Sequence, residues 1–394
     1  MLSFELTEEQ QQLQSTVREF AKAQVRPVLR ALEKNGVPAA LHDKFAELGL
    51  AGADYPEAAG GMAMGALSRA VIEEELAYGD VGAAFALDLG GAAAKLLDAV
   101  GTPAAHALLK ESLEKRWPLA LAGAEEGKAQ DDFKTVAAKD GANWVLNGKK
   151  AYVFRGEDAK ATLVLAQVDA GKGLSGAGLF VLRAGNTGIR ATKKQLTLGL
   201  NALGLHEVVL EGAKVPGADR LDAPGTLPSI LRRHYDALCV VSAARAVGLA
   251  AAAFEYARAY SEERTAFGKP IGHFQAVAFL VADMATQVDA ARWLLWKAAW
   301  TLDQKQPATA DLAAAQAQAQ EAAFFCANSA VQVLGGAGFV QDHPVEKWMR
   351  DAKTLALYGQ HAQASHATML ASEFGQPLDA PELFPLPSAH PSLS

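Results

Sequence analysis

The spacing of hydrophobic positions changes twice along the chain and so divides the sequence into three regions. From Thr7 to about Trp117, apolar residues recur at helical spacing, as in TEEQQQLQSTVREFAKAQV, where Leu13 and Val17 share one face. A threonine followed by a Glu/Gln run is typical of a helix start. The pattern therefore predicts an N-terminal helical domain over residues 1–117.

The middle region has the shorter period of β-strands. Asn147-Gly148 lies between two short apolar runs in WVLNGKKAYV, and this dipeptide is a strong signal for a tight hairpin turn. The runs ATLVLAQV, GLFVL and HEVVLEGAKVP follow it. We predict a β-barrel-like domain over residues 118–228, a size that can hold its own core.

Long helices are predicted again over residues 229–379. The stretch LRRHYDALCVVSAARAVGLAAAAFEYARAYSEERTAFG is apolar on nearly every side in its middle, so we expect other helices to bury it. The Ala-rich stretch ATADLAAAQAQAQEAA favours another helix, and together these elements predict a four-helix bundle. Residues 380–394 are Pro-rich and predict an extended tail. The fold class is α+β.

Composition narrows the possible partners. Half of the 394 residues are apolar, and the net charge of -7 includes no basic block, which argues against a nucleic-acid or anionic-membrane partner. The two cysteines, Cys239 and Cys326, lie in apolar helical stretches and imply no disulfide framework. We find neither a signal-peptide pattern nor a run that predicts a membrane span, and we expect a cytoplasmic protein without a metal site.

Two motifs carry most of the chemical information: RTAFGKPIGHFQAVAFLVADM, which begins at Arg264, and QVLGGAGFVQDHPVEKWMRDAK, which begins at Gln332. The guanidinium of Arg264 can clasp a pyrophosphate, and the ring of Phe267 can stack on an adenine. The side-chain amides of Gln275 and Gln332 can bond to ribose or phosphate oxygens. These residue types together indicate a dinucleotide site.

The second motif also contributes Val333, Gly335 and Gly336 to this candidate site. Glycines at the end of a long helix let a ligand approach the backbone closely. Each residue taken alone has a plain structural alternative. Arg264 could make an ion pair, Phe267 could be a core residue, and the two glycines could simply cap a helix.

Together the two motifs resemble the C-terminal signatures of the acyl-CoA dehydrogenase family, and the resemblance covers nearly the whole chain. It implies an acyl-CoA dehydrogenase-like fold and a FAD cofactor shared across a subunit interface. In that arrangement Arg264, Phe267, Gln275 and Gln332 grip the adenine end of a flavin whose ring lies in the neighbouring subunit. The family oxidises acyl-CoA thioesters between the α and β carbons, as in β-oxidation.

The segments that hold the flavin ring in the family are altered in this chain. The family's Thr-Glu-Pro loop reads AGAEEGKA here, over Ala122–Ala129. The later segment AYVFRG has Phe154, with Arg155 beside it, where the family has a hydroxyl residue that contacts the flavin. The positions that usually hold Arg and Ser/Thr are Asn201, Leu203 and Leu205. Simple drift, with backbone groups taking over these roles, is the alternative explanation.

Both positions at which family members carry the catalytic base lack a carboxylate. One is Gly359, in LYGQHA, and the other, counted back from Phe267, is Leu238, which also fits plain helix packing. His361 is a candidate replacement because an imidazole titrates near neutral pH, although it could equally be a surface or capping residue. Other acids that could serve a rebuilt pocket are Asp236, Glu125 and Glu126.

Three functions remain open. In the first, the chain is the non-catalytic subunit of an α2β2 acyl-CoA dehydrogenase, similar to bacterial enzymes for steroid side chains or other bulky CoA thioesters. It would lend its adenine-end residues to a homologue that carries the catalytic Glu. In the second, it is a self-sufficient flavoenzyme with a relocated base. In the third, it is a structural module without flavin chemistry. The contrast between a retained adenine-end motif and an altered flavin-ring end favours the first, and the retained motif makes the third the least favoured.

Overall fold

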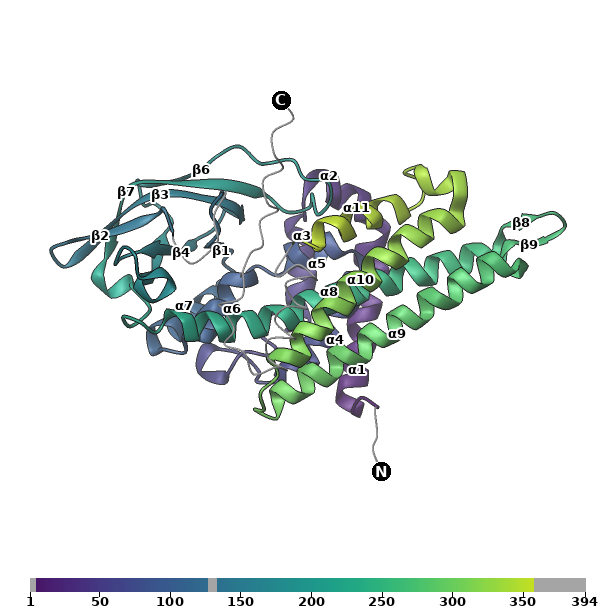
Figure 1. The fold of residues 1–394 in the computed structure, drawn as a ribbon, viewed down its shortest axis with the longest axis horizontal. Helices are drawn as coiled ribbons and strands as arrows, with labels where there is room; N and C mark the ends of the chain where they lie inside the picture. Colours follow the sequence, from purple (N-terminus) through teal and green to yellow (C-terminus); the bar gives the residue numbers. More distant parts are fainter. Residues whose placement is uncertain (1–4, 127–132, 358–394) are drawn as a thin grey trace.

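The structure is a computed structural model that describes residues 5–126 and 133–357. A sheet domain lies at one end of the long axis of the molecule, and helices occupy the remainder (Figure 1). The predicted order of helical, β and helical regions is confirmed. The change in hydrophobic period along the chain therefore marks a real change of architecture.

The first region, as far as the structure describes it, consists of helices. The predicted helix start is confirmed, because the Thr7 side chain accepts a hydrogen bond from the Gln10 backbone and the Gln10 side chain accepts one from the Thr7 backbone. The α-helices are α1 (Glu8–Phe20), α2 (Leu29–Asn35), α3 (Ala39–Glu47), α4 (Gly65–Gly79), α5 (Val81–Leu87), α6 (Gly91–Val100) and α7 (Pro103–Glu114).

The middle region forms one sheet with strand order β1-β4-β2-β3-β7-β6. Strand β5 lies off this path and pairs with β4. Strands β1 and β2 pair with β4 in parallel, whereas the other pairs in this sheet are antiparallel. The strands are β1 (Leu119–Ala122), β2 (Val136–Asp140), β3 (Asn143–Phe154), β4 (Ala161–Gln167), β5 (Ala177–Arg183), β6 (Ile189–Ala191) and β7 (Leu205–Pro216).

The hairpin predicted at Asn147-Gly148 is wrong. Both residues lie inside β3, and β2 turns into β3 earlier, where Asp140 pairs with Asn143. Gly148 stands at a register shift with φ +149°, and a Cβ there would lie 2.6 Å from the Cα of Thr135. The glycine thus permits a close approach of two backbone segments rather than a tight turn.

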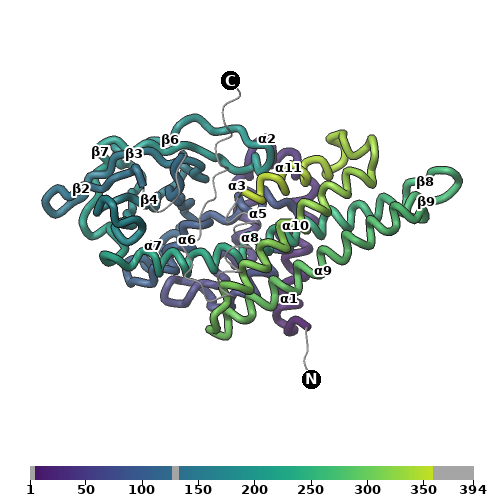
Figure 2. The backbone as a smooth tube through the Cα atoms, in the orientation of Figure 1, coloured from purple at the N-terminus to yellow at the C-terminus, as the bar shows by residue number. Residues whose placement is uncertain are grey.

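The last region is built on the long helix α8 (Leu227–Glu263), which packs against α4, α9 (Gln275–Asp303) and α10 (Thr309–Leu334). The shorter α11 (Val345–Leu355) packs against α8 and α10. Helices α8 and α9 run side by side to the small hairpin of β8 (Thr265–Ala266) and β9 (Lys269–Pro270), which stands at the end of the molecule opposite the sheet (Figure 2).

Two segments, Leu227–Glu263 and Thr309–Phe339, have the length and apolar composition of a membrane span. In the most apolar window of the first, 89% of the residues are buried inside the protein. Packing against other helices thus accounts for its hydrophobicity, as expected for a core helix. Cys239 and Cys326 are free and buried, as predicted.

A buried ammonium group connects the three regions. Lys347 of α11 donates to Asp351 on its own helix (2.6 Å) and to Asp80, which caps α5 by accepting from the Ala83 backbone (2.8 Å). Asp351 also accepts from the Leu200 backbone of the β domain (2.7 Å). Burial opposes the charge on Lys347, but the two carboxylates outweigh it and raise the pKa of the ammonium above its ordinary value.

We expect the substitution Lys347→Met to lower the free energy of unfolding by about 3 to 5 kcal/mol, because it leaves two buried carboxylates without a counter-ion. Chemical denaturation measures this loss. The exposed Lys353 of the same helix contacts only the face of the Phe324 ring among the described residues, so Lys353→Met should cost about 1 kcal/mol or less. Equal losses for the two variants would contradict the connecting role of Lys347.

Candidate functional site

A cavity of about 320 Å³ lies where the β domain meets the two helical regions, and we call it the flavin-side cavity. Its wall comes from α5, α6, β1, β3, the segment before β7, α8 and α11. Most of the lining is apolar, as in small-molecule sites. The charged side chains among its described lining residues are Asp88, Arg155 and Arg245.

The end of β3 shapes one wall of this cavity. The pairing of β3 with β7 shifts register between Lys150 and Val153, and both Tyr152 (φ +56°) and Arg155 (φ +58°) adopt the left-handed backbone conformation. The ring of Phe154 stacks on that of Phe85 from α5, with 6.2 Å between ring centroids. This wall therefore presents an aromatic stack at position 154, where the resemblance leads one to expect a hydroxyl residue.

Arg245 of α8 is almost completely buried, with 1% of its surface exposed. Its guanidinium donates to Glu73 (2.6 Å) and Asp88 (2.9 Å) and lies 4.1 Å over the ring of Phe85. Arg69 adds ion pairs to the same two carboxylates. The result is a buried network of two guanidiniums and two carboxylates beside the cavity, which Arg69 extends to Asp54 (3.8 Å).

Asp88 is the one carboxylate among the described residues that line the flavin-side cavity. Burial alone would raise the pKa of its carboxyl, but the guanidiniums of Arg69 and Arg245 outweigh burial and lower the pKa to about 2. A carboxylate held this firmly in its charged form is a weak proton acceptor. Asp88 is therefore a poor general base.

Leu238 also lines the flavin-side cavity, with 5% of its surface exposed. Leu238 was predicted to match one of the two positions at which family members carry the base, and the structure shows this apolar side chain in the cavity wall. Gly359 and His361 lie outside the described residues. Asp236 does not line the cavity; it accepts from the Thr309 hydroxyl (3.2 Å), and burial raises its pKa to about 6.

The acids near the altered Thr-Glu-Pro loop do not rebuild the pocket. Glu125 is buried and accepts from the backbones of Lys134 (2.6 Å) and Thr135 (2.9 Å) and from the Lys150 ammonium (2.8 Å). Burial opposes the charge on Glu125, but Lys150 outweighs it and lowers the pKa of the carboxyl. Glu125 thus fixes the start of β2, while Glu126 is exposed and lines no described cavity wall.

The substituted positions at the start of β7 and in the loop before it have two roles. One stabilises the loop, and the other two line the flavin-side cavity. The carboxamide oxygen of Asn201 accepts from the Thr197 backbone (3.3 Å) and hydroxyl (3.0 Å), so Asn201 fixes its own loop. Leu203 and Leu205 line the flavin-side cavity. Two positions at which the family resemblance leads one to expect polar groups therefore add to the apolar wall.

The residues predicted to grip an adenine lie at the other end of the molecule. Arg264 follows α8, Phe267 forms the turn between β8 and β9, and Gln275 begins α9 (Figure 1). Gln332 is exposed and Val333 is buried near the end of α10, and Gly335 and Gly336 follow that helix. None of these seven residues belongs to the described lining of the flavin-side cavity.

We call these seven residues the adenine-end set, and its exposed members fit one end of a dinucleotide. Phe267 is 97% exposed, so its ring has a free face for stacking. The Arg264 side chain makes no hydrogen bond or ion pair within the described part of the chain, which leaves its fork of donors free for a phosphate. A Cβ built on Gly335 or Gly336 meets nothing within 4 Å, so a ligand can approach their backbone. The flavin-ring end fits less well, because Phe154 offers no hydrogen-bond donor.

Sequence reasoning missed Arg245, Asp88 and Phe85, which line the flavin-side cavity. One signal was available for Arg245. An arginine in the middle of the apolar run VVSAARAVGLAAAA must find a carboxylate partner if that helix is buried. The identity of that partner depends on long-range packing and has no local signal.

Comparisons with known proteins agree with this geometry. Residues 7–110, 119–213 and 239–362 match the family models of the N-terminal, middle and C-terminal domains of acyl-CoA dehydrogenases. The chain is 36% identical over 365 residues to cyclohex-1-ene-1-carbonyl-CoA dehydrogenase of Geobacter metallireducens, covering 90% of this chain and 94% of the relative. It is 30% identical over 367 residues to the mitochondrial short-chain specific acyl-CoA dehydrogenase of Rattus norvegicus, covering 90% and 88%.

The solved structure of butyryl-CoA dehydrogenase from Megasphaera elsdenii is similar with a TM-score of 0.90 and 30% sequence identity, covering 95% of this chain and 100% of that one. Glutaryl-coenzyme A dehydrogenase in complex with glutaryl-CoA is similar with a TM-score of 0.89 and 28% identity, covering 97% and 99%. The fold predicted from the two motifs is confirmed. The chain belongs to the acyl-CoA dehydrogenase family of FAD-dependent oxidoreductases.

Proposed function

We propose that this chain is the non-catalytic subunit of a hetero-oligomeric acyl-CoA dehydrogenase. It supplies the adenine-end half-site for FAD to a homologous partner that carries the catalytic Glu, in a heterotetramer of the cytoplasm. The observation that carries the proposal is the wall of its own flavin-side cavity, where the apolar Leu238 lies at the position that the sequence matches to a base of the family. The complex dehydrogenates an acyl-CoA thioester between its α and β carbons.

Proton removal explains why this wall matters. A general base must accept the α proton of the thioester, and such a base typically contributes about 10²- to 10⁴-fold in rate. Leu238 cannot accept a proton, and Asp88, held ionised by Arg69 and Arg245, accepts one only weakly. The described wall of this chain's own cavity thus lacks an effective base.

The position of the adenine-end set supports sharing between chains. Arg264, Phe267 and Gln275 stand at the tip of the α8–α9 pair, at the end of the molecule opposite the sheet domain (Figure 1). The flavin-side cavity has walls from β1 and β3 of that sheet domain. A flavin held by these outward-facing residues therefore has its ring in another subunit.

The residues of this chain then have binding roles only. Arg264 donates to the pyrophosphate, Phe267 stacks on the adenine, and Gln275 and Gln332 bond to ribose or phosphate oxygens. FAD, when bound, accepts the hydride that leaves the β carbon of the substrate. The exposed ring of Phe267 is covered by the cofactor and the partner, which removes its apolar surface from water.

We expect the purified chain alone to bind little FAD and to show no bleaching of flavin absorbance when an acyl-CoA is added without oxygen. Mixed with a homologue that has Glu at either family base position, it should gain FAD and support bleaching. Visible absorbance per chain and anaerobic titration with acyl-CoA thioesters of several sizes, bulky ones included, measure both. Stoichiometric flavin that bleaches in the chain alone would show that the chain is a self-sufficient enzyme.

In the mixed complex, Arg264→Ala should weaken FAD binding by about 10- to 100-fold, because it removes charge-assisted hydrogen bonds to the pyrophosphate. Flavin release on dilution measures the change. The matched control is Arg258→Ala, since Arg258 is also exposed on this end of α8 but is paired with Glu262 (3.7 Å). The control should leave FAD binding unchanged. Equal effects of the two substitutions would remove Arg264 from the site.

A further inference from the structure

The flavin-side cavity opens to solvent along an apolar rim. Tyr152 and Leu357 are the exposed members of its described lining, and neither carries a charge. The apolar surface continues on either side of the lining residue Thr197, because Leu196 is 92% exposed and Leu198 is exposed as well. Apolar side chains gathered around the mouth of a cavity in this way mark a surface that another group covers.

The described part of the chain ends in the wall of this cavity, at Leu357. Residues 358–394 therefore start at the cavity itself. A flexible chain of about 25 residues has a root-mean-square span of about 25 to 30 Å, so residues near 383 can return to the wall from which the chain departs. Binding within one chain has an effective concentration in the millimolar range, so even weak contacts suffice.

The sequence of this segment suits an apolar wall that contains aromatic rings. Residues 383–387 read LFPLP. Pro385 and Pro387 favour an extended backbone in the residues before them and have no N–H, so the run can lie on an apolar surface with few unpaired donors. Proline-rich runs dock in grooves lined by aromatic side chains. The flavin-side cavity offers the rings of Tyr152 and Phe154.

Charge also favours this wall. Residues 358–394 contain no lysine or arginine, and their acids are Glu373, Asp379 and Glu382. The loop that brings Thr197 into the wall also carries Lys193 and Lys194, both exposed. Opposite charges therefore flank the two apolar surfaces, which favours their association.

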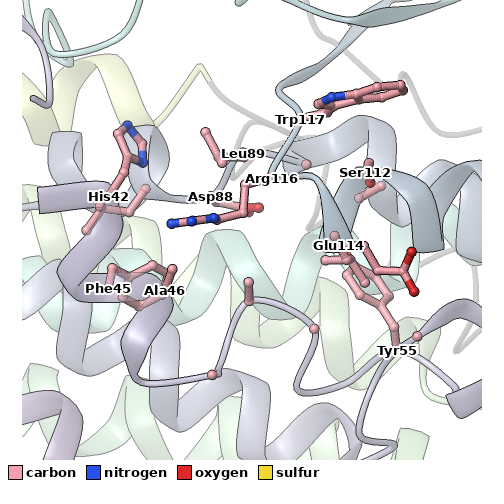
Figure 3. A pocket seen from close by; sticks show the side chains of 18 of the residues that line it. His42, Phe45, Ala46, Tyr55, Asp88, Leu89, Ser112, Glu114, Arg116 and Trp117 are labelled. Carbon is pink, nitrogen blue, oxygen red and sulfur yellow. The ribbon is translucent and has the colours of Figure 1, made fainter. Parts of the chain in front are cut away.

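A larger cavity in the N-terminal helical region fits this segment less well. Its volume is about 870 Å³, and we call it the N-terminal cavity. The exposed charged residues of its described lining are Asp43, Glu47, Glu114 and Arg116. Figure 3 shows Glu114 and Arg116 at this cavity, and Arg116 is already paired with Asp43 (2.8 Å). The two glutamates repel an acidic segment, whereas the described lining of the flavin-side cavity has no exposed charged residue.

We propose that residues 383–387 cover the flavin-side cavity of their own chain, with their apolar side chains against Tyr152 and Leu357. This inference rests on the proposed function, in which the chain does not use its own cavity for a flavin. The covering segment removes the apolar rim from water. It also closes this cavity to a flavin ring, so that FAD is directed to the cavity of the partner.

The test is chemical cross-linking in the full-length chain. Ala92→Cys places a thiol in the lining of the flavin-side cavity, and Ser388→Cys places one next to the apolar run. The native cysteines are buried and do not compete. A short bis-maleimide should join the two introduced thiols within one chain at least about tenfold faster than it joins Ser388→Cys to Ala276→Cys. Ala276 is exposed at the start of α9, at the opposite end of the molecule. Mass spectrometry of tryptic peptides identifies the linked pairs.

Substitutions in the segment test the apolar contact. Phe384→Ser combined with Leu386→Ser should slow the linking at Ala92→Cys by about tenfold or more, because it removes apolar side chains from the run. The matched control Leu393→Ser changes an apolar residue outside the run and should leave the rate unchanged. Equal linking rates at Ala92→Cys and Ala276→Cys, or a rate that the double substitution does not change, would overturn the proposal. So would linking only between two chains that each carry one thiol, since the occupant would then be a second copy.

Flavin content of the same preparation separates this inference from the proposed function. A colourless chain whose thiols are joined as expected supports both. A colourless chain whose thiols are not joined overturns the covered cavity and leaves the partner-subunit role intact. Stoichiometric FAD that bleaches with an acyl-CoA in the chain alone overturns the proposed function, and the cavity is then open to flavin whether or not the thiols are joined.

Discussion

The arrangement of the three regions depends on a single buried positive charge, the Lys347 ammonium. Burying three charged groups is unfavourable unless all of them meet in good geometry, so the ion pairs fix where α11 and α5 lie relative to each other. Asp351 extends the constraint to Leu200, which lines the flavin-side cavity. The shape of that cavity is thus set by an electrostatic contact outside it.

Much of the fold was predictable because it follows from local physics. The Thr7 cap, the buried α8 and the strands of the middle region appear in the sequence as a capping pattern, an apolar run and a short period. The hairpin predicted at Asn147-Gly148 was wrong because the preference of this dipeptide for turns takes no account of contacts with the rest of the sheet. Here the approach of Gly148 to Thr135 across the sheet determines the conformation, and no local rule includes that contact.

Site residues could be predicted from the sequence where they lie at a fixed spacing from a recognisable motif. They could not be predicted where an ion pair joins residues from distant parts of the chain. Counting from Phe267 identified Leu238, and the structure places that residue in the cavity wall. The pairing of Arg245 with Asp88 joins residues 157 positions apart, so no spacing rule reveals it. Glu125 was ambiguous in the sequence for the same reason, since its partner Lys150 belongs to another strand. The roles of Gly359 and His361 stay predictions.

The two ends of the molecule are under different physical constraints. At the adenine end, side chains such as Phe267 are exposed and do not contribute to a core, so a ligand or partner is the simplest reason to keep them. At the flavin-side cavity, Phe154, Leu203 and Leu238 pack as an apolar wall, which needs no cofactor to be stable. A chain of this kind can remain folded whether or not its own cavity is used.

The Lys347 contact also has a consequence for synthesis on the ribosome. Asp80 emerges early and Lys347 emerges 267 residues later, so the N-terminal helices form while Asp80 still lacks its counter-ion. The first region therefore reaches its final stability only when α11 has been made and has docked. Translation that stops before residue 347 yields a chain with an uncompensated carboxylate at the start of α5 and without the ion pairs that hold α11 to the first region.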